Sequence, residues 1–227
     1  MRIIVLGSGA GGGFPQWNCN CENCRLAWAN DPRVRARTQS SLAISADGER
    51  WLLLNASPDL RQQIIATPSL QPRSAQRHSP IAGVFLTNGD VDHVTGLLTL
   101  REQQPFSIYG SPTTLTQVQQ GVFGVLNPQL VKRVEVTPGA CVDPGLGFTI
   151  EAFTVPGKPP LYLEGSGIEA QIGAETDSTI GLEIVSGSTR VYYIPGCAKV
   201  TPALAARVSG ADALFFDGTT FTDDEIR

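Results

Sequence analysis

The chain has 227 residues, of which 41% are hydrophobic and 17% are charged, and its formal net charge is −4. This composition is typical of a globular protein with a hydrophobic core, and we treat residues 1–227 as one domain. Because there is no basic excess to neutralise phosphates, the charge balance argues against a general binder of nucleic acid or anionic membranes. The first apolar run ends at Gly7, which makes it too short for a signal peptide or a membrane span, so we expect a cytoplasmic protein.

Short runs rich in β-branched and aromatic residues recur along the chain, and we expect each to form a strand. In chain order the expected strands are 3–6, 41–45, 51–55, 81–86, 106–109, 134–136, 148–155, 179–185, 191–194 and 213–216. The expected helices are 22–29, 60–66, 94–103, 112–119 and 202–208, and loops are expected at 67–80 and 156–177. Strands 41–45 and 51–55 read as a hairpin through Asp47 and Gly48, whereas later strands alternate with helices. The mixture predicts an α/β fold with mixed sheets packed by helices.

A glycine-rich loop follows the first expected strand. Gly7, Gly9 and Gly12 satisfy the G-x-G-x-x-G spacing of a dinucleotide site. That site needs a helix N-terminus directly after the glycines, and residues 14–18 do not begin a helix. We interpret the loop as a turn that brings the backbone close to a metal centre or to a neighbouring strand.

Three of the five cysteines, Cys19, Cys21 and Cys24, lie within six residues. Thiolates in such spacing are typical of a structural zinc site, which needs four ligands. A redox role for the Cys21-x-x-Cys24 pair is the alternative, but no thioredoxin-like βαβ unit surrounds it. The fourth ligand is either His78 or a residue beyond Arg227, and we favour the second. Cys141 and Cys197 stand alone and are expected to be small buried hydrophobic residues.

A second candidate metal site follows the expected strand 81–86. Asp90, Asp92 and His93 offer two carboxylates and an imidazole before a helix. Such donors suit Fe(II) or Mn(II) at least as well as zinc. In the alternative interpretation the segment is an ordinary turn, with Asp92 as the N-cap of a helix that begins at Val94. The residues alone leave both interpretations open.

The run 86–97 resembles the H-x-H-x-D-H loop of the metallo-β-lactamase superfamily, with Asn88 and Asp90 in the places of two histidines and with Asp92 and His93 retained. Asn55 takes the place of the aspartate in the superfamily's earlier Asp-x-Gly motif. Expected ligands are also absent from 155–157 and 193–197. The resemblance implies an αββα sandwich of two mixed β-sheets flanked by helices.

Together with residues 7–24, this pattern resembles the family of pyrroloquinoline quinone (PQQ) biosynthesis B proteins. The resemblance implies an iron-dependent hydroxylation of the tyrosine ring in a Glu–Tyr-derived precursor. Asp90, Asp92, His93 and a histidine beyond Arg227 would hold Fe(II) or another divalent metal, and other PQQ-biosynthesis proteins are candidate partners. The rival hypothesis is a non-catalytic carrier that aids release or transport of PQQ, or of its precursor, to the periplasm.

Two further observations bear on the resemblance. The chain contains only two histidines, His78 and His93, whereas a dinuclear zinc hydrolase of this superfamily uses about five among its ligands. Classical zinc hydrolysis is therefore not expected, and a residual phosphodiesterase ranks lowest. Residues 222–225 have the form of a helix capping box close to the end of the sequence, so we expect that a C-terminal segment is missing.

Overall fold

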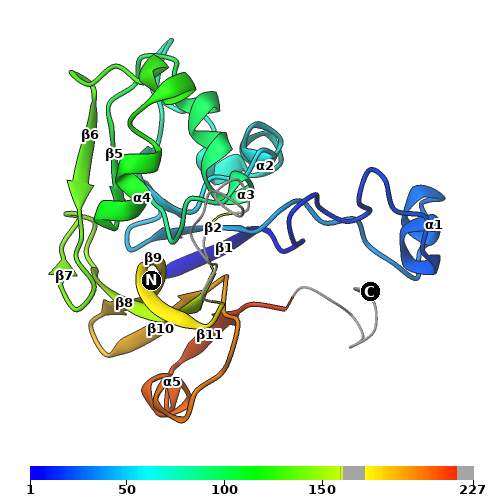
Figure 1. The fold of residues 1–227 in the computed structure, drawn as a ribbon. Helices are drawn as coiled ribbons and strands as arrows, with labels where there is room; N and C mark the ends of the chain where they lie inside the picture. The colour runs from blue at the N-terminus through cyan, green and yellow to red at the C-terminus, as the bar shows by residue number, and fades with distance from the viewer. Residues whose placement is uncertain (159, 161–171, 219–227) are drawn as a thin grey trace.

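The computed structural model describes residues 1–158, 160 and 172–218. Two β-sheets lie face to face, and helices cover the outer face of each sheet (Figure 1). This helix–sheet–sheet–helix arrangement is the αββα sandwich expected from the sequence.

The first sheet has six strands in the order β1-β2-β3-β4-β5-β6. Its strands β1, β2 and β3 are antiparallel neighbours, whereas β3, β4, β5 and β6 run parallel. The predicted hairpin is confirmed, because β2 and β3 pair directly. The bounds are β1 Arg2–Gly7, β2 Ser41–Ser45, β3 Trp51–Leu54, β4 Ile81–Phe85, β5 Phe106–Gly110 and β6 Val131–Glu135.

The second sheet has five strands in the order β11-β10-β9-β8-β7. All neighbours are antiparallel except β10 and β11, which are parallel. The bounds are β7 Cys141–Val142, β8 Thr149–Gly157, β9 Ala174–Ser186, β10 Thr189–Ile194 and β11 Ala213–Phe216.

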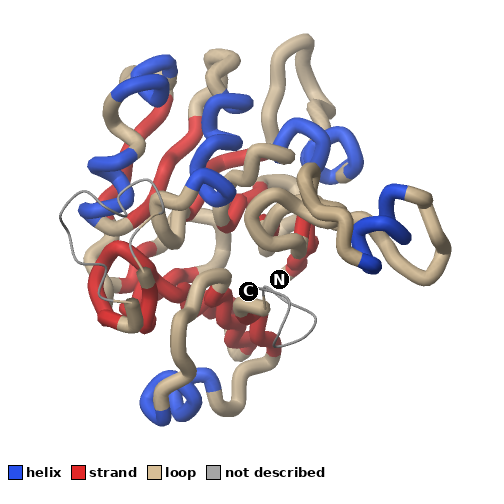
Figure 2. Tube along the Cα trace, turned by 45° about the vertical axis from the view of Figure 1, so that its right-hand side comes forward, coloured by secondary structure: helices blue, strands red, loops and turns tan. Residues whose placement is uncertain are grey.

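Short helices complete the layers. Helices α2, α3 and α4 lie over the first sheet and α5 lies over the second, while α1 projects away from both sheets on an extension (Figures 1 and 2). Among the described residues, no helix has the length and apolar character needed to cross a membrane. The α-helices are α1 Glu22–Trp28, α2 Leu60–Ala66, α3 Val91–Val94, α4 Pro112–Gln117 and α5 Pro202–Val208, and the 3-10 helices are η1 Pro68–Leu70, η2 Thr95–Leu100 and η3 Gly121–Val125.

The central strands of the first sheet, β2 to β5, are buried on both faces. In β3, Leu52 and Leu54 pack against the second sheet, whereas Trp51 and Leu53 pack against the helices above. This two-sided burial explains why the strands read as continuous apolar runs rather than as an alternation. On the far side of the second sheet, Leu204 of α5 packs with residues of β8 and β10 in a smaller cluster.

The predicted element types are largely confirmed, but several bounds are wrong. The strand expected at 134–136 begins at Val131. The prediction began too late because the polar Lys132 and Arg133 interrupt the apolar run. The two-residue β7 was not predicted. The expected loop 156–177 is also too long, since β8 continues to Gly157 and β9 begins at Ala174, with Pro156 paired to Glu175. The capping box at 222–225 lies outside the described residues.

The helix expected at 94–103 is replaced by the short α3 and the 3-10 helix η2. The tighter geometry accompanies a close approach of Gly96 to the end of β3. The Gly96 N–H donates to the Ala56 carbonyl at 2.9 Å, and the Ala56 N–H donates to the His93 carbonyl at 2.8 Å. A Cβ at Gly96 would overlap the Ser57 carbonyl oxygen and would lie 2.8 Å from that of Ala56. Only glycine therefore lets the segment that carries His93 dock here.

We expect Gly96→Ala to lower the free energy of unfolding by about 1–3 kcal/mol, because the added methyl group meets backbone that cannot rotate away. Gly124→Ala is the matched control, since a Cβ there meets nothing within 4 Å. Urea unfolding followed by circular dichroism measures both variants. Equal stability of the two would contradict the packing described here.

Candidate metal centre

The loop that follows β4 carries the predicted ligands. Asn88 forms an isolated bridge with Thr179 of β9, so this loop is attached to the second sheet as well as to the first. Helix α3 begins at Val91 with Asp90 at the N-cap position, and no side chain caps it. Asp92 lies in the first turn. The alternative in which Asp92 caps a helix that begins at Val94 is therefore wrong.

The amide of Asn88 has a defined orientation. The Asp90 N–H donates to Asn88 Oδ1 at 3.1 Å, and Asn88 Nδ2 donates to Asp90 Oδ2 at 2.8 Å. The same Oδ1 lies 2.6 Å from Nδ1 of His93. Because an amide oxygen only accepts, Nδ1 of His93 carries the hydrogen and Nε2 keeps its lone pair. Asn88 thus fixes the tautomer that can bind a metal through Nε2.

His93 and Asp92 form a donor pair. His93 is 4% exposed, and its Nε2 lies 3.8 Å from Asp92 Oδ2. That separation is too long for a hydrogen bond and is compatible with two ligands of one ion. Burial lowers the pKa of His93, and the charges of Asp92, Asp90 and Asp217 oppose this shift. The neutral imidazole is the form that coordinates metals.

An open cavity of about 580 Å³ lies beside this pair. Its walls include Asp90, Asp92, His93 and part of the glycine-rich loop. A Cβ at Gly11 would lie 3.4 Å from Asp92 Oδ2, so the missing side chain leaves that face of the carboxylate open. The loop thus brings backbone close to the candidate metal site, as predicted, and no helix follows it directly. The cavity is also lined by Ser40, Lys158, Tyr193 and Asp217, none of which was predicted as a site residue.

Of the three predicted ligands of the second site, two lie close together and the third is directed elsewhere. Asp90, Asp92 and His93 line one cavity, and Asp92 and His93 face each other. Asp90 instead directs a carboxylate oxygen to Asn88. Within the described ranges, the only group of three or more His, Cys, Asp or Glu donor atoms that all lie within 4.8 Å of one another is Cys19, Cys21 and Cys24.

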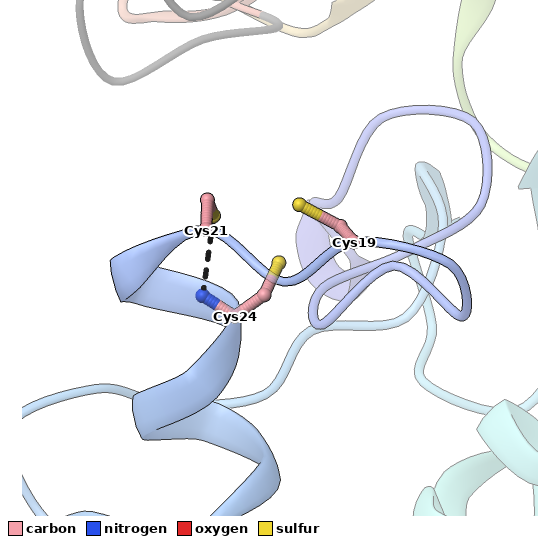
Figure 3. Close-up of side chains that lie close together, drawn as sticks. All are labelled: Cys19, Cys21 and Cys24. Carbon is pink, nitrogen blue, oxygen red and sulfur yellow. Dashed lines mark hydrogen bonds between the residues drawn. The ribbon is translucent and has the colours of Figure 1, made fainter.

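The three cysteines converge at the start of α1 (Figure 3). Cys21 is the N-cap, and its Sγ accepts a hydrogen bond from the Cys24 N–H at 3.4 Å. This backbone donor lowers the pKa of Cys21, whereas burial raises the pKa of Cys24 to about 11. Sulfur ligands of one zinc ion lie about 3.8 Å apart, given Zn–S bonds of about 2.3 Å, so the three thiols fit such an ion. His78 is not part of this group, and its Nδ1 accepts from the Arg73 N–H in another loop.

Comparison with known proteins identifies the family. A model of the beta-lactamase superfamily domain matches residues 50–227. The coenzyme PQQ synthesis protein B of Methylorubrum populi is 58% identical over 227 residues, which cover 100% of this chain and 75% of that protein. The chain belongs to the PQQ synthesis protein B family of the β-lactamase superfamily.

Solved structures agree with this membership. A crystal structure of Zn²⁺-bound PqqB from Methylobacterium extorquens is 57% identical and matches with a TM-score of 0.95, over 99% of this chain and 75% of that one. A diphosphatase from the PhnP family is 20% identical with a TM-score of 0.64, over 93% of this chain and 71% of that one, and shows the shared fold alone. The superfamily model begins at residue 50, so the glycine-rich loop and the three cysteines lie outside it, while the match to the PQQ synthesis protein of Methylorubrum populi covers these positions.

The two remaining cysteines do not behave as expected. Cys141 is exposed on the short β7, and Cys197 is half-buried in the loop after β10. The prediction that both are small buried hydrophobic residues is therefore wrong. Cys197 lies beside the candidate site, where its N–H donates to Asp217 Oδ2 at 3.0 Å.

We expect Cys21→Ser to remove one equivalent of tightly held zinc per chain, because it takes one thiolate from the group of three. Cys141→Ser is the matched control, since this exposed cysteine is remote from that group in sequence and is not part of it. Metal analysis after mild chelation measures the content of each variant. The same zinc content in both would exclude the cysteine group as a zinc site.

Proposed function

We propose that this protein acts in PQQ biosynthesis and hydroxylates the tyrosine ring of a Glu–Tyr-derived precursor at a site with a divalent metal, preferably Fe(II). Relatives at 58% identity named coenzyme PQQ synthesis protein B support the pathway. The observation that carries the reaction type is the pairing of Asp92 with His93 at the wall of a cavity of about 580 Å³. A cavity of that size accommodates a small-molecule substrate.

The donor atoms favour this chemistry over hydrolysis. A carboxylate and an imidazole with space beside them suit a mononuclear iron site with open positions. When bound, Fe(II) supplies the activation of dioxygen. The sequence has only one histidine besides His93, too few for the dinuclear zinc centre of superfamily hydrolases. We assign zinc to Cys19, Cys21 and Cys24, in line with the Zn²⁺-bound relative from Methylobacterium extorquens.

Lys158 is suited to hold the acidic end of the substrate. The other charged side chains that line the cavity among the described residues are Asp90, Asp92 and Asp217. Lys158 forms no ion pair within the described part of the chain. A Glu–Tyr-derived precursor carries carboxylates, and an ammonium group at the cavity wall offsets their charge. We further propose that the protein works in the cytoplasm, with other PQQ-biosynthesis proteins as partners.

The reaction is tested directly with the Glu–Tyr dipeptide. One oxygen atom of O₂ enters a ring C–H bond, and the other leaves as water with two electrons and two protons from an added reductant such as ascorbate. We expect protein that is loaded anaerobically with Fe(II) and then supplied with O₂ and the reductant to form the ring-hydroxylated dipeptide, detected by mass spectrometry. We expect His93→Ala to form at most about one hundredth as much, because it removes a metal ligand. No product from loaded wild-type protein would refute the hydroxylation.

The carrier hypothesis predicts a different result. A carrier binds PQQ tightly, keeps that affinity in Asp92→Ala and His93→Ala, and converts no precursor. This combination would replace the proposed enzyme with a binding protein.

The orienting role of Asn88 has its own test. We expect Asn88→Ala to weaken Fe(II) binding about 10- to 100-fold, because Nδ1 of His93 loses the acceptor that fixes its tautomer. Gln119→Ala, an exposed change in the loop after α4, is the control. Anaerobic titration with Fe(II) gives the affinities. An unchanged affinity in Asn88→Ala would show that His93 does not need this partner, or that the metal does not bind there.

A further inference from the structure

A buried hydrogen-bond chain lies behind one wall of the cavity. It starts at Asn55, which is 0% exposed and directly follows β3. Asn55 Oδ1 accepts from the Thr87 N–H at 2.9 Å. A backbone N–H only donates, so this bond fixes which end of the amide is oxygen. Nδ2 therefore points to Thr87 Oγ1 at 2.9 Å and to the Tyr193 hydroxyl at 3.3 Å.

Tyr193 continues the chain towards the cavity. It is 2% exposed, and its hydroxyl lies 3.2 Å from Ser40 Oγ. Burial raises the pKa of Tyr193 well above its ordinary value, so the phenol stays protonated. Asn55 Nδ2 has no lone pair and cannot accept the phenol hydrogen. A buried hydroxyl requires an acceptor, and Ser40 Oγ is the one that the described residues provide.

Ser40 is the last residue of this hydrogen-bond chain. Its N–H donates to the Gly9 carbonyl at 2.9 Å, which fixes its backbone against the glycine-rich loop. Ser40 lines the cavity with Asp92 and His93 and is only partly buried. Its Oγ accepts from Tyr193, and within the described ranges no acceptor binds its own hydrogen. The Ser40 hydroxyl is therefore oriented to donate into the cavity.

We propose that Ser40 determines ligand specificity by donating a hydrogen bond to a ring oxygen of the bound ligand, a phenol or quinone oxygen, with Tyr193 and Asn55 as positioning residues. This inference rests on the proposed function, which brings a tyrosine-derived ring into the cavity. The nonpolar side chains of Leu42, Leu214 and Phe215 also line the cavity and suit an aromatic ring. Lys158, the one cation among its described charged residues, suits the carboxylates of the same ligand. A ring oxygen held at Ser40 shares the cavity with Asp92 and His93, where ring hydroxylation is proposed.

The affinities of two dipeptides isolate the contribution of the ring oxygen to binding, because Glu–Phe differs from Glu–Tyr only in lacking that oxygen. Glu–Tyr and Glu–Phe are titrated anaerobically into Fe(II)-loaded protein by calorimetry, so that no turnover contributes. We expect wild-type protein to bind Glu–Tyr about 5- to 10-fold more tightly than Glu–Phe, as for one net hydrogen bond. Ser40→Ala should abolish this preference and leave the Glu–Phe affinity unchanged, whereas Ser40→Thr, which keeps the hydroxyl, should retain it.

The positioning role of Tyr193 predicts a different effect on the preference for Glu–Tyr. Tyr193→Phe frees the Ser40 hydroxyl to rotate, so we expect a preference for Glu–Tyr smaller than in wild type but not abolished. Thermal unfolding verifies that each variant is folded.

The failures of the two proposals are distinguishable. If wild-type protein binds both dipeptides equally, or if Ser40→Ala weakens both to the same extent, the role of Ser40 is refuted and the proposed function stands. If neither dipeptide binds to wild-type protein, the proposed substrate class is refuted, and the role of Ser40 with it.

Discussion

The candidate metal centre depends on the orientation of one buried amide, that of Asn88. Its oxygen accepts from the Asp90 backbone and faces His93 Nδ1, while its nitrogen donates to the Asp90 carboxylate. One side chain therefore sets the tautomer of the imidazole and engages a neighbouring carboxylate. The backbone of Asn88 also bridges to Thr179 of β9, so the residue is attached to the second sheet as well as to its own loop. Without this constraint the His93 ring would lose the partner that fixes its tautomer and its orientation beside Asp92.

Asn55 shows the same principle on the other side of the site. In the superfamily pattern a histidine stands at the position of Asn88 and an aspartate at that of Asn55, and here both amides have their oxygen fixed by a backbone N–H. An amide is a weak metal ligand, but it combines an acceptor and a donor in one rigid plane. An amide in place of a carboxylate or an imidazole thus has a weaker capacity to bind metal and a greater ability to orient its neighbours. In this chain the neighbours are His93 and Tyr193, and each presents a polar group to the cavity.

The sequence was most informative where local chemistry determines structure. The apolar runs of β3 and β4, the hairpin through Gly48 and the cysteine spacing before α1 could all be read from neighbouring residues. It was least informative where contacts are distant in the chain. The 3-10 helix after His93 follows from the approach of Gly96 to Ala56. The roles of Ser40 and Tyr193 were not predictable, because their contact spans 153 residues. Ser40 lies in no recognisable motif, and the segment 193–197 was noted only for the absence of an expected ligand.

The arrangement also separates two kinds of metal chemistry in space. The sulfur donors lie on the extension around α1, which projects away from the sheets (Figures 1 and 2), whereas the oxygen and nitrogen donors follow β4, in α3 and the loop before it. Soft thiolates favour zinc, and a carboxylate with an imidazole tolerates iron. The two candidate sites therefore differ in donor chemistry as well as in their place in the fold. The glycine-rich loop links the two regions, because it leads from β1 along the cavity wall to the cysteines. The extension and the part of the cavity wall beside Asp92, where Gly11 has no side chain, therefore belong to one continuous segment.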